Sequence, residues 1–149
     1  ELGQKPAKDA LLTVNYDGRF EETTGCAVLA ATSAVQKEMA TYIRQAMSSS
    51  LSLGQALATA LRAWALGDRA QRHAGAESER GDDKETAGAK PAPTDAAALS
   101  AHLRENIAEK AIECAVLDRN QPGSSKYRAL TSDELGRLLP ADLKAALAL

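Results

Sequence analysis

Residues 112–130 read IECAVLDRNQPGSSKYRAL, and this stretch decides the fold. Its first six residues are mostly apolar, which predicts a strand over 112–117. The next eight, 118–125, contain the Asn, Pro and Gly that favour a turn. Residues 126–130 then predict a second short strand. The stretch therefore predicts two strands joined by a tight connection, and helices are expected on either side of it.

A helix is expected directly after this pair of strands. Thr131-Ser-Asp-Glu134 has the form of a capping box, in which the threonine and the glutamate satisfy each other's backbone N–H groups. Leu135, Leu138 and Leu139 supply its apolar face. Pro140 interrupts the pattern, so residues 142–149 are expected to add only one or two further helical turns.

Before these elements, the N-terminal part of the chain predicts a hairpin. Leu12, Val14 and Tyr16 alternate with polar residues, and Asp17-Gly18 suits the positive φ angles of a tight hairpin turn. The second strand is expected in two pieces, 19–22 and 26–30, with a bend at Gly25 between them.

Three further helices have sequence signals at their ends. Ser33 to Gln36 and Ser52 to Gln55 both have the capping-box pattern, and Gly67 is the expected C-terminal stop of the second helix. Thr94 or Asp95 is expected to cap the third helix. The apolar faces expected to be buried are Val35, Met39, Ile43, Ala46 and Met47, then Leu53, Ala56, Leu57, Ala60, Leu61 and Trp64, then Leu99, Leu103, Ile107 and Ala111.

Residues 68–93 differ from the rest of the chain. They are polar, interspersed with Gly and Pro and rich in both charge signs, so they cannot bury enough apolar surface to offset their ordering entropy. Core-like elements resume after them. We therefore interpret 68–93 as a flexible insertion within a single domain, 1–149, of α+β class with antiparallel sheets.

Composition excludes several classes of function. The formal net charge is −2 with both signs intermixed, which gives no broad basic surface for nucleic acid. No apolar run approaches the roughly 20 residues that span a bilayer, and no signal pattern begins the chain. The sequence therefore favours a soluble cytoplasmic protein without nucleic-acid or membrane partners.

The residue types that usually perform chemistry are sparse. His73 and His102 are interpreted as solvated surface residues, Cys26 and Cys114 as small buried free thiols, and the acidic run 79–85 as a solvated charge run. There is no glycine-rich phosphate loop and no nucleophile elbow. We therefore expect no catalytic residue, no cofactor-binding residue and no metal ligand.

Taken in order, several stretches resemble proteasome α-subunits of the bacterial, actinobacterial type. Residues 12–18, LTVNYDG, resemble the hairpin of that family, and 112–120, IECAVLDRN, resemble its strand and following turn. Further similarity lies in CAVLAA at 26–31, LSLGQAL at 51–57, KYR at 126–128 and SDEL at 132–135. The chain departs from the family at Ala30-Ala31, where a pair of glycines is usual, and in the length of its insertion.

This resemblance implies the C-terminal half of a four-layer αββα sandwich of the N-terminal-nucleophile hydrolase type. It implies a non-catalytic structural and gating subunit, a component of a threonine-protease complex that is not itself an enzyme. The implied partners are proteasome β-subunits, other α-subunits in a homo-heptameric ring, and an ATPase ring activator. Residues 106–112 lack the Ser-Gly element that supports the catalytic threonine in β-subunits. We also expect a longer natural polypeptide at the N-terminus, or a partner that covers the exposed face.

Two alternatives stay open. The chain could belong to a catalytic HslV-like or other N-terminal-nucleophile hydrolase whose nucleophile lies upstream, or it could be an unrelated α+β interaction domain. The preferred interpretation requires that the segments on both sides of 68–93 share one layered core and pack onto the same sheets.

Overall fold

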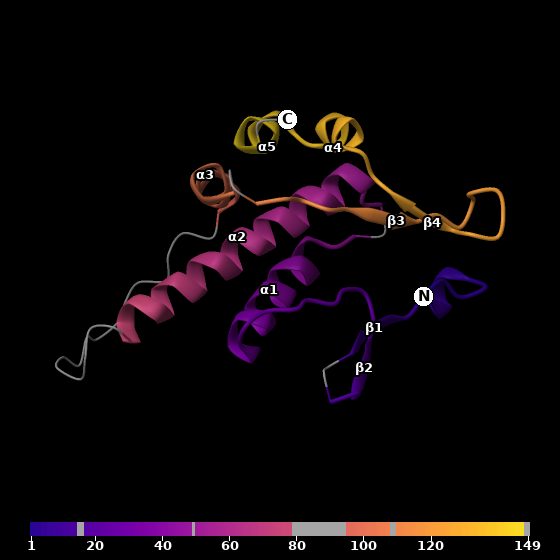
Figure 1. The fold of residues 1–149 in the computed structure, drawn as a ribbon, viewed down its shortest axis with the longest axis horizontal. Coiled ribbons are helices and arrows are strands. Elements are labelled where there is room, and N and C mark those ends of the chain that lie inside the picture. The colour runs from indigo at the N-terminus through magenta and orange to yellow at the C-terminus, as the bar shows by residue number, and fades with distance from the viewer. Residues whose placement is uncertain (15–16, 49, 79–94, 108–109, 148–149) are drawn as a thin grey trace.

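The computed structural model describes residues 1–14, 17–48, 50–78, 95–107 and 110–147 (Figure 1). These residues form five α-helices and two small antiparallel sheets, which confirms the α+β class. The elements are the 3-10 helix η1 (Pro6–Lys8), β1 (Leu11–Val14), β2 (Phe20–Thr23), α1 (Ser33–Ala46), α2 (Leu53–Ser78), α3 (Ala96–Asn106), β3 (Ala115–Leu117), β4 (Tyr127–Ala129), α4 (Ser132–Leu138) and α5 (Ala141–Leu147). No helix within the described ranges has the length and apolar character needed to cross a membrane.

The hairpin β1–β2 forms as predicted, but its register differs by one residue from that of a two-residue turn. Val14 lies opposite Phe20, whereas a turn formed by Asp17-Gly18 alone would place Val14 opposite Glu21. Gly18 has φ of 77°, the left-handed conformation expected of a turn glycine. The longer connection matters because a shift of one residue exchanges the faces on which one strand's side chains lie.

The second piece of that strand, predicted over 26–30, is not part of either sheet. Gly25 has φ of 83° and bends the chain after β2, as predicted. Beyond it, Cys26 and Val28 are buried while Leu29 is exposed, which is the alternation of a strand. These residues pair with no described strand, so their assignment to a sheet was wrong.

Helix starts follow local hydrogen-bonding chemistry closely. The capping box of α2 is confirmed: Ser52 N–H donates to Gln55 Oε1 at 2.8 Å, and Gln55 N–H donates to Ser52 Oγ at 3.3 Å. The N-cap of α1 is Thr32 rather than the predicted Ser33. Either hydroxyl can cap a helix, so the sequence alone could not show which of these two neighbours is the N-cap.

Helix α2 continues through Gly67 to Ser78, so the predicted stop at Gly67 and the predicted start of the insertion at residue 68 were wrong. Gly67 is buried where α2 crosses α1, and a Cβ atom at this position would overlap Met39 and lie 3.3 Å from Val35 Cγ1. The glycine therefore permits close helix packing and does not end the helix. Residues 79–94 lie outside the described ranges.

The C-terminal elements lie where they were predicted, but β3 (Ala115–Leu117) is shorter than the strand predicted over 112–117. Asp95 caps α3, with Ala98 N–H donating to its side chain at 2.8 Å. The capping box of α4 is complete: Glu134 N–H donates to Thr131 Oγ1 at 3.3 Å, and Thr131 N–H donates to Glu134 Oε2 at 2.9 Å. Pro140 separates α4 from α5.

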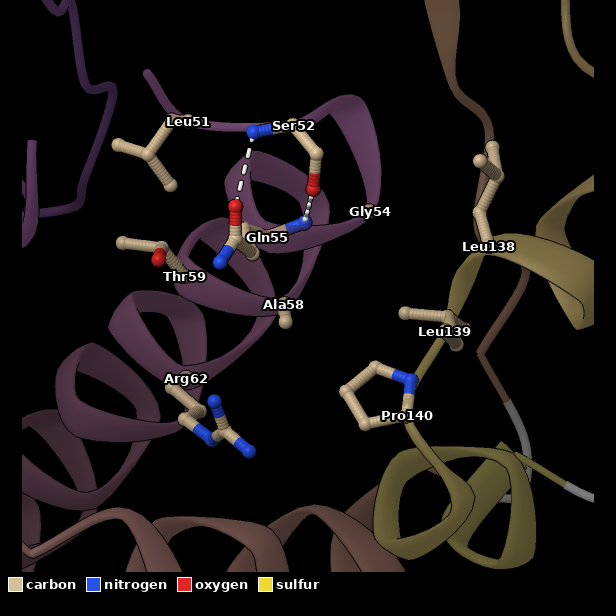
Figure 2. Close-up of a pocket in the computed structure, with 10 residues that line it drawn as sticks. All are labelled: Leu51, Ser52, Gly54, Gln55, Ala58, Thr59, Arg62, Leu138, Leu139 and Pro140. Carbon is tan, nitrogen blue, oxygen red and sulfur yellow. Dashed lines mark hydrogen bonds between the residues drawn. The ribbon is translucent and has the colours of Figure 1, made fainter. Parts of the chain in front are cut away.

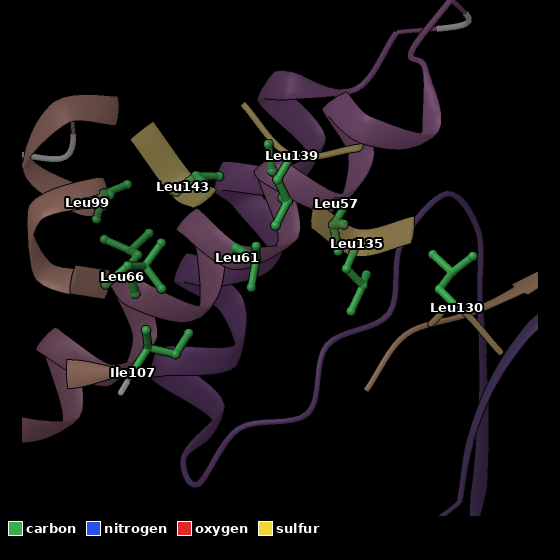
Figure 3. Packing of buried hydrophobic residues seen from close by; sticks show 12 residues of the cluster. Leu57, Leu61, Leu66, Leu99, Ile107, Leu130, Leu135, Leu139 and Leu143 are labelled. Carbon is green, nitrogen blue, oxygen red and sulfur yellow. The ribbon is translucent and has the colours of Figure 1, made fainter. Parts of the chain in front are cut away.

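One main hydrophobic core joins the two sides of the polar stretch (Figure 3). It contains Leu57, Ala58, Leu61, Ala65 and Leu66 from α2, and Leu99, Leu103, Ile107, Leu130, Leu135, Leu139 and Leu143 from the later elements. Residues on both sides of 68–93 thus share this core, while Cys26, Val28 and Ala40 form a second, smaller cluster. The prediction of shared sheets was wrong for the described strands, because β1–β2 and β3–β4 are separate two-stranded sheets.

The apolar faces predicted for the helices are only partly buried. Val35, Leu57, Leu61, Leu99, Leu103 and Ile107 are buried as predicted, whereas Ala46, Met47, Leu53, Ala56, Ala60 and Ala111 are exposed. Helix α2 packs against α1 on one side and against α3 and α4 on another, so its buried surface is wider than a single stripe (Figure 1).

Candidate assembly surface

The hairpin β1–β2 presents an apolar face to solvent. The register places Leu12, Val14 and Phe20 on one face of the ribbon, because side chains alternate along each strand and directly opposed residues share a face. Their exposed fractions are 49%, 69% and 73%.

The opposite face of the same hairpin carries Leu11 and three polar residues, and the polar residues turn toward α1. Thr13, Glu21 and Thr23 line a small cavity of about 210 Å³, together with Cys26 and residues of α1. A hairpin that rests on a helix usually places its apolar side inward and its polar side in water. Here three polar side chains face inward, and the outer face carries three apolar residues beside the charged Glu22.

The hairpin β3–β4 is apolar on its outer face as well. Leu117 and Tyr127 lie directly opposite each other and are 46% and 58% exposed. On the inner face, Val116 packs against the main core, and Leu130 just beyond β4 belongs to it. That inner face is mixed, because Arg128 lies directly opposite Val116 and pairs with Glu134.

Large exposed hydrophobic side chains gather on these strands. We call the following residues the outer strand faces: Leu12, Val14, Phe20, Leu29, Leu117 and Tyr127. Outside the strands and the segment after β2, the large hydrophobics exposed among the described residues are Met47 and Leu53, at the α1–α2 connection. Isolated two-stranded ribbons are marginally stable in water, so the outer strand faces are a candidate interface.

An arginine clamp holds the N-terminal segment beside the turn that follows β3 (Figure 1). The guanidinium of Arg119 donates to Asp9 Oδ1 at 2.6 Å and Oδ2 at 2.9 Å, and it also donates to the carbonyl of Gly3. The hydrogen bond from Arg119 lowers the pKa of Asp9 below its usual value. The clamp thus links the chain just before β1 to the β3–β4 hairpin.

A pocket of about 450 Å³ opens between the start of α2 and the α4–α5 corner (Figure 2). Arg62 lies at one end of it, where its Nη2 donates to Asp142 Oδ2 at 3.0 Å. Ser100, which is buried, donates to the same oxygen at 2.8 Å and with Arg62 lowers the pKa of Asp142. These side chains satisfy one another across α2, α3 and α5, and this network is therefore structural.

His102 was predicted to be solvated, and that interpretation was wrong. Its side chain is 14% exposed, and its Nε2 lies 2.9 Å from Asp68 Oδ2, while Asn106 lies 3.3 Å from its Nδ1. Partial burial raises the pKa of Asp68, but hydrogen bonds from Arg72 and His102 outweigh it and the net shift is downward. The unexpected length of α2 creates this contact, because Asp68 becomes helical and faces α3.

The remaining predicted residues are dispersed. His73 is exposed, on α2 rather than in a loop. Cys26 and Cys114 are free thiols; Cys26 is buried, and Cys114 is partly buried, which raises its pKa. Residues 79–85 lie outside the described ranges. Among the residues that the structure describes, no group of three or more His, Cys, Asp or Glu side chains could hold a metal ion.

Three comparisons with known proteins add nothing to these observations: the chain matches no protein-family model, no curated protein and no solved structure.

The pairs Arg62–Asp142 and Asp68–His102 had no sequence signal, because their members are 80 and 34 residues apart and no motif links them. The outer strand faces could be anticipated in part from the alternation in 12–16.

Proposed function

We propose that this chain is a non-catalytic structural and gating α-type subunit of a bacterial proteasome core particle, acting in the cytoplasm. It would support ATP-dependent protein degradation that partner β-subunits carry out. The observation that carries the proposal is the exposed apolar side of the strands: Leu12, Val14 and Phe20 on β1–β2, and Leu117 and Tyr127 on β3–β4.

A helix layer under a sheet with an apolar outer face is one half of a four-layer αββα sandwich. In such a sandwich a second sheet would cover Leu12, Val14 and Phe20, and the same holds for Leu117 and Tyr127. The three inward polar side chains of β1–β2 support this arrangement, because they leave apolar side chains on the outer side. The clustering of exposed apolar groups on strands supports assembly rather than a freestanding domain.

Within the described residues, the polar clusters support a structural role rather than hydrolysis. Ser100 donates its proton to a carboxylate, and His102 contacts Asp68 and Asn106 rather than a hydroxyl or thiol. A nucleophile needs an adjacent base, and Asp142 is a weak one because Ser100 and Arg62 lower its pKa; Ser100 is also buried.

Electron microscopy of the full-length polypeptide, co-expressed with its β-subunit, tests the proposal. We expect seven-fold α-rings stacked on β-rings. A matched variant with Phe20→Asp and Leu117→Asp should form no rings, whereas Glu38→Lys, on the exposed side of α1, should form them normally. A monodisperse monomer in the presence of the β-subunit would contradict the proposal.

A further inference from the structure

The cavity of about 210 Å³ between the hairpin β1–β2 and α1 is lined mainly by polar side chains. The hairpin and the helix each contribute three that matter here: Thr13, Glu21 and Thr23, and Gln36, Lys37 and Arg44. Among the described residues, no hydrogen bond or ion pair joins the side chains of the first group to those of the second. The two elements thus face each other with polar groups that do not pair across the cavity.

The hydroxyl of Thr23 indicates that this cavity holds a polar molecule. Its oxygen is buried, and no described residue hydrogen bonds to it. A buried hydroxyl without a partner is costly, and native proteins rarely leave one unpaired. Cys26 and Val28, which are buried in a cluster with Ala40 of α1, give the same cavity an apolar wall. Polar groups that converge beside an apolar wall are typical of a small-molecule site.

Three charged side chains lie at the mouth of the cavity. Lys37 and Arg44 are exposed and lie two turns apart on one face of α1, because residues seven apart share a helix face. Glu21 is exposed on the hairpin side. Within the described residues none of the three forms an ion pair, so each is available to a ligand. Water would satisfy the Thr23 hydroxyl, but it would not neutralise these charges.

We propose that this cavity binds a free acidic amino acid, with its two carboxylates at Lys37 and Arg44 and its ammonium group at Glu21. The two negative charges and one positive charge of this ligand complement the charges at the mouth. One carboxylate also accepts the hydrogen bond that the buried Thr23 hydroxyl can donate. The cavity is smaller than the about 300–1,000 Å³ of pockets for drug-sized molecules, which fits a ligand of this size.

The site lies on the inner face of β1–β2, opposite the side chains of the outer strand faces. This inference therefore stands or falls separately from the proposed function.

Isothermal titration calorimetry of the full chain tests the proposal. L-aspartate and L-glutamate are each compared with the diacid of the same length, succinate and glutarate, which lack the ammonium group. We expect one of the amino acids to bind with a Kd below about 1 mM, and its diacid to bind at least about tenfold more weakly. Weaker binding of both amino acids, or equal binding of the amino acid and its diacid, would overturn the proposal.

Substitutions on β2 locate the binding. Thr23→Val keeps the shape of the side chain and removes the hydroxyl, and we expect it to weaken amino-acid binding about tenfold. Glu21→Gln should weaken binding of the amino acid and strengthen binding of the diacid, because it removes a carboxylate that attracts an ammonium group and repels an anion.

Glu22→Gln is the matched control, because Glu22 adjoins Glu21 and lies on the opposite face of the strand. It should change both Kd values less than about twofold, and circular dichroism of each variant checks that the fold is retained. If Glu21→Gln and Glu22→Gln have equal effects on binding, the amino acid binds elsewhere and the inference is wrong.

Discussion

Gly54 in the first turn of α2 packs against the carbonyl oxygen of Leu138 at the end of α4, with no room for a side chain between them. A Cβ atom at position 54 would collide with that oxygen and lie 3.3 Å from the carbonyl carbon. Backbone cannot move aside as a flexible side chain can. The contact therefore fixes how closely α4 approaches the start of α2.

Gly54→Ala is expected to destabilise the chain even though alanine favours helix. Overpacking typically costs about 1–3 kcal/mol, which outweighs the gain of up to about 1 kcal/mol in helix propensity. Gly67→Ala is the comparison in the same helix, because its obstacles are the side chains of Met39 and Val35 rather than backbone. Urea denaturation should show a clear loss for the first variant and a change smaller than about 1 kcal/mol for the second. Equal effects would contradict this distinction.

Thr131→Ala should lower the free energy of unfolding by about 1 kcal/mol. It removes the hydroxyl that accepts the Glu134 N–H bond and so opens the capping box of α4. Thr131→Ser keeps the hydroxyl and should retain most of the stability. Thermal unfolding followed by circular dichroism separates the two variants, and an equal loss in both would point to packing of the threonine methyl group instead.

Ser100→Ala should weaken the chain at neutral pH and matter less in acid. The Ser100 hydrogen bond is the main cause of the lowered pKa of Asp142, so the charged carboxylate is favoured in the folded state. Its contribution is complete above about pH 5 and is lost as the pH falls through the folded pKa, which lies below the usual 3.8. We expect a loss of about 1 kcal/mol at pH 7 that narrows as the pH falls below the usual carboxyl pKa of 3.8. A difference that stays constant with pH would contradict the assignment.

Phe20→Asp should leave the fold intact and reduce self-association of the isolated chain. Phe20 is 73% exposed, so its loss should cost less than about 1 kcal/mol through the cross-strand contact with Val14. Sedimentation velocity measures the association. Leu99→Asp provides the contrast, because Leu99 is fully buried and this change should unfold the chain. Unchanged association of Phe20→Asp would remove β1–β2 from the candidate interface.

Local signals allowed much of the secondary structure to be predicted. The caps at Ser52, Asp95 and Thr131 depend on side chains within three residues of the backbone groups that they satisfy, so the sequence contains all the necessary information. The same holds for Gly18 and Gly25, whose positive φ angles follow from the glycine itself.

The errors came from contacts between distant residues. Gly67 has the sequence appearance of a helix stop, but its role is decided by Met39 and Val35 on another helix. His102 became a buried partner only because α2 runs on to include Asp68. The strand pattern in 26–30 was real, yet pairing needs a second strand that no local signal identifies. The sequence therefore indicated that apolar strand residues would form the candidate interface, but not how the strands that carry them would be arranged.

The Arg119–Asp9 clamp has a kinetic consequence. Its two residues are separated by 110 positions, so the ion pair can close only after the intervening chain has already been organised. Interactions that form after the transition state govern how fast a protein unfolds and leave its folding rate nearly unchanged. Removing Arg119 should therefore raise the unfolding rate and leave the folding rate nearly unchanged.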